Sequence, residues 1–195
     1  MSALPTARVP VGVEIGATTT MHARELLVID GRLAFAGELA RGARATIELL
    51  VLDPSRDGIV QISEALRGRS DITAVHLVGR GAPGRVLLGG SELSLDTLPR
   101  YREHLGAWFG ESTPFEPRPE ILLYGCRVGE GAVGERFLDE LAMTARAEVA
   151  GSDDLTGASS EGGDFELEVR TGAIAALFPL DRTLAERVFG TLELE

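Results

Sequence analysis

The sequence predicts an α/β fold with a mainly parallel sheet that is covered by helices on both faces. Short apolar runs with the length of buried strands alternate along the chain with segments of helical periodicity, which is the pattern of βαβ units. The runs are mostly apolar, as in strands buried on both faces. The chain has 195 residues, no internal repeat and no clear linker, so it suits one domain with or without a tail.

Five buried strands are expected, each bounded by turn-forming or polar residues. They are ELLVID at 25–30, ATIELLVL at 45–52, AVHLV at 74–78, ILLY at 121–124 and EVAG at 148–151. The run VLLGGSEL at 86–93 is typical of a small β-hairpin with Gly-Gly at its tip. The run DFELEVR at 164–170 alternates as a half-exposed strand does.

Helices are expected where the apolar period is near 3.6. The predicted ranges are 33–41, 58–66, 95–109, 134–147 and 180–192. Residues 1–24 have little periodicity and are expected to form a loosely ordered lead-in. The domain proper is then residues 25–175, and residues 176–195 form a helical tail that packs on the domain or extends from it.

Composition limits the partners and the compartment. With 19 Lys and Arg against 30 Asp and Glu, the net charge is −11, which argues against nucleic acid and anionic membranes as partners. One cysteine cannot form an internal disulfide. No apolar run is long enough to span a membrane, and the first 24 residues lack a secretory signal, so a cytoplasmic location is expected. Non-classical export, origin in a larger parent and the oligomeric state stay open.

Two glycine-rich turns carry the candidate chemistry. The segments 79–84 (GRGAPG) and 125–129 (GCRVG) each follow a buried strand, and the carboxyl ends of parallel strands meet at one edge of a sheet. Cys126 lies 126 − 80 = 46 residues after Arg80, close to the spacing of a caspase-type Cys-His pair. Cys126 is therefore a candidate nucleophile, with backbone amides near Gly81 and Cys126 as oxyanion donors. The alternative is a small buried hydrophobic residue.

Arginine occupies the position of the base in this spacing. Arg80 cannot act as a general base because a guanidinium does not deprotonate in proteins. It could stabilise a thiolate, or it could be a turn residue that faces water or pairs with a carboxylate. His76 does not replace it, because four residues of strand place His76 about 13 Å back from the turn. We interpret His76 as a core histidine.

Two acidic segments offer weaker hypotheses. Asp153 and Asp154 follow the fifth strand and could line a pocket for a basic side chain, or only cap a turn. The segment from Asp53 to Glu64 has the spacing of a calcium loop. A helix cap by Ser55 or Asp57 accounts for the same residue pattern. The sequence contains no P-loop, dinucleotide fingerprint or zinc spacing, and neither a metal nor a cofactor is expected.

Several segments together resemble one family. They are ELLVID, LLVLDPSRDGIVQISEAL, AVHLVGRGAPG, LLGGSEL, ILLYGCRVGEG, VAGSDDLTGA and GGDFELEVRTGAI. They are similar to the bacterial domain of unknown function 4347, which is placed in the caspase-like peptidase clan and often lies near the start of very large cadherin-like or calcium-repeat surface proteins. The resemblance implies a caspase-like three-layer αβα sandwich.

The resemblance also implies roles for the two turns. In the family the first turn typically contains Ser-His-Gly, with the histidine as presumed base and the cysteine after the later strand as presumed nucleophile. Cys126 matches this pattern, whereas Gly79-Arg80-Gly81 lacks the histidine. The expected function is a binding or scaffolding module with a degenerate dyad and a protein or peptide partner.

Two other functions stay open. In the first, Cys126 is the nucleophile of a cysteine hydrolase, and Asp153 or Asp154 selects a basic side chain of the substrate. In the second, the loop that begins at Asp53 tunes an interaction domain with calcium.

Overall fold

The computed structural model describes residues 24–110, 117–188, 190 and 192–194, so most of the predicted lead-in lies outside the described residues. Its central sheet has six strands in the order β2-β1-β3-β7-β8-β9. Neighbours from β2 to β8 are parallel, and β9 is antiparallel to β8. A separate three-stranded antiparallel sheet has the order β4-β5-β6. The predicted α/β class with a mostly parallel sheet and a small hairpin is confirmed.

The elements follow one another as the sequence pattern predicts. The strands of the central sheet are β1 (Arg24–Asp30), β2 (Ile47–Leu52), β3 (Ile72–Val78), β7 (Glu120–Tyr124), β8 (Glu148–Gly151) and β9 (Val169–Arg170). Those of the small sheet are β4 (Gly81–Ala82), β5 (Arg85–Leu88) and β6 (Ser91–Ser94). The helices are α1 (Ala36–Arg41), α2 (Gly58–Leu66), α3 (Leu98–Gly106), α4 (Gly131–Ala145) and α5 (Arg182–Val188), with a 3-10 turn at Ser159–Glu161.

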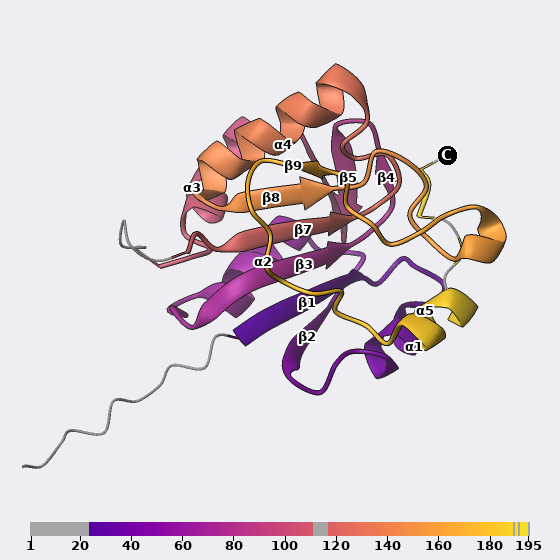
Figure 1. Cartoon of the computed structure of the whole chain (residues 1–195). Helices are drawn as coiled ribbons and strands as arrows, with labels where there is room; N and C mark the ends of the chain where they lie inside the picture. Colours follow the sequence, from indigo (N-terminus) through magenta and orange to yellow (C-terminus); the bar gives the residue numbers. More distant parts are fainter. Residues whose placement is uncertain (1–23, 111–116, 189, 191, 195) are drawn as a thin grey trace, which may run out of the picture.

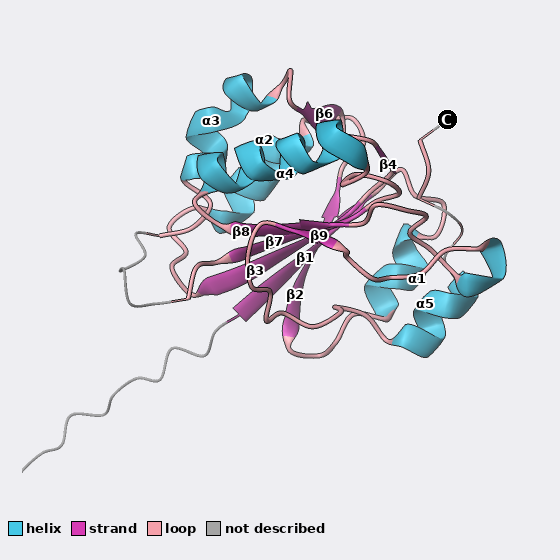
Figure 2. Ribbon diagram, turned by 45° about the horizontal axis from the view of Figure 1, so that its top comes forward, coloured by secondary structure: helices cyan, strands magenta, loops and turns pink. Residues whose placement is uncertain are grey.

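Helices cover both faces of the central sheet. Figure 2 shows α2, α3 and α4 on one face and α1 and α5 on the other. Alternate residues of each strand enter different cores, because successive side chains of a strand point to opposite faces. In β1, Leu26 and Val28 belong to the core under α2–α4, whereas Leu27 and Ile29 belong to the core with α1 and α5. This second core is called the lower core below.

Several predicted elements are shorter than expected, including the helices predicted at 33–41 and 95–109, which are observed as Ala36–Arg41 and Leu98–Gly106. Of the alternating run 164–170, only Val169–Arg170 forms a strand, because only these residues pair with β8. The predicted helix 180–192 is observed as Arg182–Val188. Leu192 is not helical: its amide donates to the Thr156 carbonyl oxygen at 3.1 Å. The tail is therefore part helix and part extended chain.

The topology brings the two glycine-rich turns to one edge. The chain passes from β1 to β2 on one side, and β3, β7 and β8 then lie on the other side of β1 (Figure 1). Such a reversal of strand order is where ligands bind in open α/β sheets. The carboxyl ends of β1, β3 and β7 therefore frame the candidate site.

Candidate functional site

The turns after β3 and β7 touch through their backbones. The Gly79 amide donates to the Tyr124 carbonyl oxygen at 3.2 Å. A Cβ atom added to Gly81 would lie 2.8 Å from the carbonyl oxygen of Cys126 and 2.9 Å from the carbonyl carbon of Gly125. Only glycine fits at position 81 without a backbone shift, because real Cβ atoms do not approach backbone so closely.

Two amides of these turns converge on one oxygen. The N–H groups of Gly81 and Cys126 both donate to the carbonyl oxygen of Leu192, at 2.8 and 3.3 Å. The sequence predicts amides near Gly81 and Cys126 as oxyanion donors, and their geometry suits a carbonyl oxygen. The oxygen that they hold belongs to the same chain.

Residues 192–194 run as an extended segment through the site; we call this the 192–194 segment. The Leu192 amide donates to the Thr156 carbonyl oxygen at 3.1 Å, and the Leu194 amide donates to the Gly81 carbonyl oxygen at 3.0 Å. Glu193 forms a parallel bridge with Gly81, so the segment lies beside β4 near the yellow end of the chain in Figure 1. Sequence reasoning missed this segment.

Cys126 is fully buried at the end of β7. Its Sγ lies 3.5 Å from the carbonyl oxygen of Thr156, so the hydrogen bond of the thiol goes to a backbone carbonyl and not to an imidazole or carboxylate. Burial raises the pKa of the Cys126 thiol, and the negative charge of Glu193 adds to this, although backbone hydrogen bonds and the charge of Arg127 act in the opposite direction. The surroundings thus favour the neutral thiol over the thiolate.

Arg80 acts electrostatically on Asp30, the last residue of β1. Asp30 is fully buried, and its Oδ1 accepts hydrogen bonds from the amides of Arg32 (3.2 Å) and Gly89 (3.3 Å). Burial raises the pKa of Asp30, and the charge of Arg80 is among the influences that lower it. The Nε of Arg80 is buried and has no hydrogen-bond partner among the described residues. The influence of Arg80 on a carboxylate is this charge effect on Asp30, and no ion pair of Arg80 is present among the described residues.

Arg127 is a second residue that the sequence analysis missed. Its backbone is left-handed, with φ of 58°, which strains a residue other than glycine. The Arg127 amide donates to the Asp154 carbonyl oxygen at 2.7 Å, which holds this conformation. Its Nη1 donates to Glu193 Oε1 at 3.0 Å. Its position directly after the strand-end cysteine was the available signal.

His76 is a buried core residue, as its place in the strand predicts. It lies in the middle of the sheet, in register with Leu27 on β1 and Leu122 on β7. Its Nε2 lies 3.0 Å from Glu25 Oε2. The hydrogen bond with His76 is the main influence that lowers the pKa of Glu25; burial opposes it, and Arg44 reinforces it.

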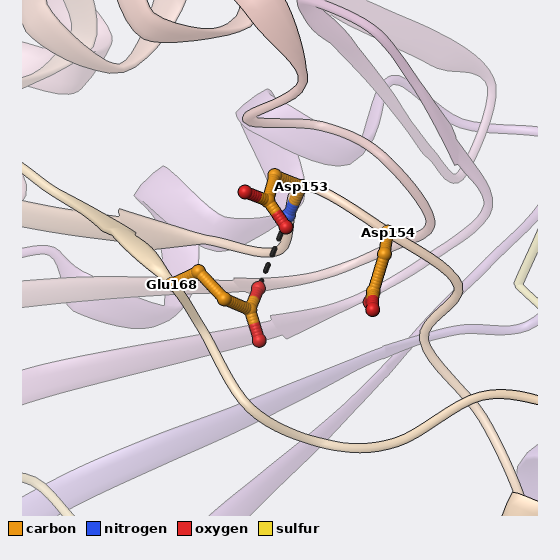
Figure 3. Close-up of side chains that lie close together, drawn as sticks. All are labelled: Asp153, Asp154 and Glu168. Atoms are coloured by element: carbon orange, nitrogen blue, oxygen red, sulfur yellow. Dashed lines mark hydrogen bonds between the residues drawn. The ribbon is translucent and has the colours of Figure 1, made fainter.

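Asp153 and Asp154 are exposed and lie next to Glu168 (Figure 3). The ligand atoms of the three acids lie within 4.8 Å of one another, and the Asp153 amide donates to Glu168 Oε2 at 3.2 Å. Burial raises the pKa of Glu168, and the two aspartates add to the increase. The arrangement offers negative charge to a cation, but exposed acids often gather without one.

The predicted calcium loop has another role in the structure. Asp57 caps α2 through its Oδ1, which accepts the amides of Ile59 (3.0 Å) and Val60 (3.2 Å). Asp53 bonds to Ser55, and Glu64 pairs with Arg56 at 2.8 Å. These carboxylates have separate partners because Gly58 begins a helix that carries Glu64 away. The cap explains the sequence pattern without a calcium ion.

A pocket of about 200 Å³ lies in the lower core. Its lining includes Tyr124, Phe165, Phe178 and Arg182. None of the predicted site residues lines it. We place the candidate site at the strand ends, because the chemistry-bearing groups converge there.

A family model described as "Domain of unknown function (DUF4347)" matches residues 26–191, which include both glycine-rich turns. A comparison with curated proteins gave no match. In the part of the chain that the structure describes, no helix has the length and apolar character needed to cross a membrane.

Proposed function

We propose that this chain, which belongs to the DUF4347 family of domains of unknown function, is a caspase-like domain that binds an extended peptide without cleaving it. The observation that carries the proposal is the pair of amides, Gly81 and Cys126, on the carbonyl oxygen of Leu192. Amides so placed bind the main chain of any extended peptide. The site therefore has the means to hold a peptide.

Among the described residues, no group at the strand ends is placed to supply the proton chemistry of cleavage. Amide hydrolysis needs a group that delivers a proton to the leaving nitrogen, and Arg80 cannot do this in the working pH range. The thiol of Cys126 bonds to a backbone carbonyl and is shifted toward its neutral form. Losing a general base typically removes ~10²–10⁴ of rate, so turnover of peptides would be poor.

A peptide-library digest tests the proposal directly. The wild-type chain and Cys126→Ala are incubated with the same library, and products are read by mass spectrometry. We expect the two digests to be identical. Cleavage that disappears with Cys126→Ala would overturn the non-proteolytic role.

The pH dependence of thiol alkylation gives a second measurement. Because burial raises the pKa of Cys126, we expect its alkylation by iodoacetamide to increase only above the range of a free thiol, about pH 8.5. Glutathione under the same conditions is the matched reference. A rate that already levels off near pH 6 would reveal an activated thiolate.

A cysteine hydrolase is the second candidate function, and the same amide pair favours it. An oxyanion would occupy the position of the Leu192 oxygen, and Asp153 or Asp154 would select a basic side chain. Thioesters and activated esters would be its best substrates, since their leaving groups need little protonation. Neither candidate requires a metal or cofactor.

The substitution Arg80→His tests whether the site lacks only a general base or also lacks the geometry for cleavage. With an imidazole at position 80, the Cys126 thiol can lose its proton, attack the Leu192 carbonyl carbon and release the Glu193 nitrogen, which takes that proton. Water then hydrolyses the thioester. We expect slow cleavage between Leu192 and Glu193 in Arg80→His and none in Arg80→His/Cys126→Ala, measured by intact mass. An intact Arg80→His chain would mean that more than the base is missing.

A further inference from the structure

We propose that the 192–194 segment is a self-ligand, and that the place it occupies between the two turns binds extended peptides with a leucine-like residue followed by an acidic residue. The inference rests on the proposed function and names its ligand class. The leucine-like residue places its carbonyl oxygen between the Gly81 and Cys126 amides, as Leu192 does. The acidic residue takes the place of Glu193.

Main-chain hydrogen bonds hold the 192–194 segment. Their partners come from three separate parts of the chain: the turn at Gly81, the turn at Cys126 and the loop at Thr156. They bond to the oxygen and nitrogen of Leu192 and to the nitrogen of Leu194. All of these contacts are between main-chain atoms and do not depend on the side chains of the segment. A separate peptide added to the protein could therefore form all of them.

Side-chain selectivity at the first position comes from the lower core. Leu192 is fully buried and belongs to that core together with Phe165, Leu180 and Ala185. A charged side chain placed among apolar neighbours loses its hydration without a compensating partner. This position therefore accepts an apolar side chain and rejects aspartate or lysine.

Selectivity at the second position comes from Arg127. Glu193 is exposed, and its Oε1 lies 3.0 Å from Nη1 of Arg127. The strained left-handed backbone of Arg127 and its bond to the Asp154 carbonyl fix the direction from which this charge is presented. An exposed ion pair is weak, so the acidic preference is a modest one that falls with added salt.

The test releases the segment in the full chain and measures access to Cys126. In the wild type the sulfur is fully buried, and the backbone of the same residue is bonded to Leu192. We expect Leu192→Asp to raise the alkylation rate of Cys126 at least tenfold at neutral pH, well below the unfolding temperature. Circular dichroism and urea unfolding confirm that the variant is folded.

Two matched leucine-to-aspartate variants control for damage to the core. Leu180 is 4% exposed in the same lower core but lies outside the 192–194 segment, and Leu177 is 69% exposed. We expect Cys126 to be alkylated at the wild-type rate in Leu177→Asp. In Leu180→Asp we expect slower alkylation than in Leu192→Asp when the two variants are compared at equal free energy of unfolding. Equal rates in Leu180→Asp and Leu192→Asp would overturn the inference.

Peptides added in trans then test the ligand class. The probe is the synthetic peptide GTLELE, which has the sequence of residues 190–195. We expect it to restore protection of Cys126 in Leu192→Asp, GTLKLE to protect several-fold less well, and GTDELE not to protect. Protection by all three peptides alike, or by none, would overturn the inference.

A charge exchange covers the case in which Leu192→Asp does not fold. Both Arg127 and Glu193 are exposed enough that their substitution leaves the core intact. We expect Arg127→Glu and Glu193→Arg each to speed hydrogen exchange at the Gly81 amide and the double variant to slow it again. Equal exchange in all of these chains would contradict the role given to Arg127.

The result also separates this inference from the proposed function. Cys126-dependent cleavage of GTLELE after its leucine would overturn the non-proteolytic role and leave the ligand class standing. Absence of both cleavage and protection would overturn the self-ligand and leave the non-proteolytic role standing.

Discussion

At the scale of single residues, the candidate site depends on backbone groups more than on side chains. Gly81 and Cys126 contribute their amides, and Thr156 contributes its carbonyl oxygen. The absence of a side chain at Gly81 matters most, because a Cβ atom there would clash with backbone atoms of Cys126 and Gly125. Substitutions that alter the backbone should therefore disturb the site more than changes of charge.

Gly81→Ala tests this dependence. The added Cβ would lie 2.5 Å from Val128 Cγ2 and 2.8 Å from the Cys126 carbonyl oxygen, so the two turns must separate. We expect a loss of about 1–3 kcal/mol of unfolding free energy in urea, together with faster alkylation of Cys126. Gly110→Ala is the control: its nearest contact is 3.5 Å, and it should stay within about 0.5 kcal/mol.

Asp57 makes a second prediction at this scale. Besides capping α2, its Oδ2 accepts hydrogen bonds from Tyr101 Oη (2.7 Å) and Arg100 Nη2 (2.9 Å). We expect Asp57→Ala to cost about 2–3 kcal/mol, because both the cap and the bond to α3 are lost. Asp57→Asn keeps a good cap and should cost clearly less by urea unfolding. Equal losses would mean that the bonds of Oδ2 to α3, and not the cap, carry the effect.

At the scale of elements, the strands were predictable and one end of the chain was not. The runs that became the inner strands β1, β3 and β7 are mostly apolar because the sheet has a core on both faces, whereas the edge strand β2 leaves Leu49 and Val51 exposed. The sequence predicts one helix over 180–192. The structure ends the helix at Val188, because the Leu192 amide and carbonyl bond to distant parts of the chain.

The positions of the two turns in the site were predictable from the sequence, but the roles of their side chains were not. Strand-end positions placed the turns of Arg80 and Cys126 together, since parallel strands present their carboxyl ends at one edge. The influence of Arg80 on Asp30 and the role of Arg127 could not be derived, because both depend on side-chain directions that spacing does not determine. The occupant of the amide pair depends on a contact that spans more than 60 residues of sequence.

At the scale of the whole molecule, ion pairs connect strands at the edge opposite the site. Arg69 donates to both oxygens of Glu48 on β2 and both oxygens of Asp71, at 2.7 to 2.9 Å. Arg24 on β1 also bonds Glu48, at 2.9 Å. These hydrogen bonds, led by those of Arg69, lower the pKa of Glu48 and of Asp71 to about 2 each.

The pH dependence of stability follows from these shifts. The folded pKa values of Glu48 and Asp71 are below their ordinary values of 4.5 and 3.8, so the network stabilises the fold above about pH 4.5 and loses this effect as the pH falls toward 2. We expect Arg69→Met to lower stability at pH 7 and to flatten the decline between pH 4.5 and 2, measured by urea unfolding. Arg41→Met removes an exposed pair with Glu38 and should leave the profile unchanged.

The parallel bridge between Gly81 and Glu193 also has a consequence for association between molecules. The bridge gives β4 a neighbour on the side that faces away from β5. The main-chain groups of Gly81 on that edge of the small sheet are therefore paired. A chain in which the 192–194 segment has been released would expose unpaired main-chain groups of β4. These groups can pair with any other extended strand, including one from a second copy. Dimers and larger aggregates should therefore accumulate with concentration in Leu192→Asp and not in the wild type.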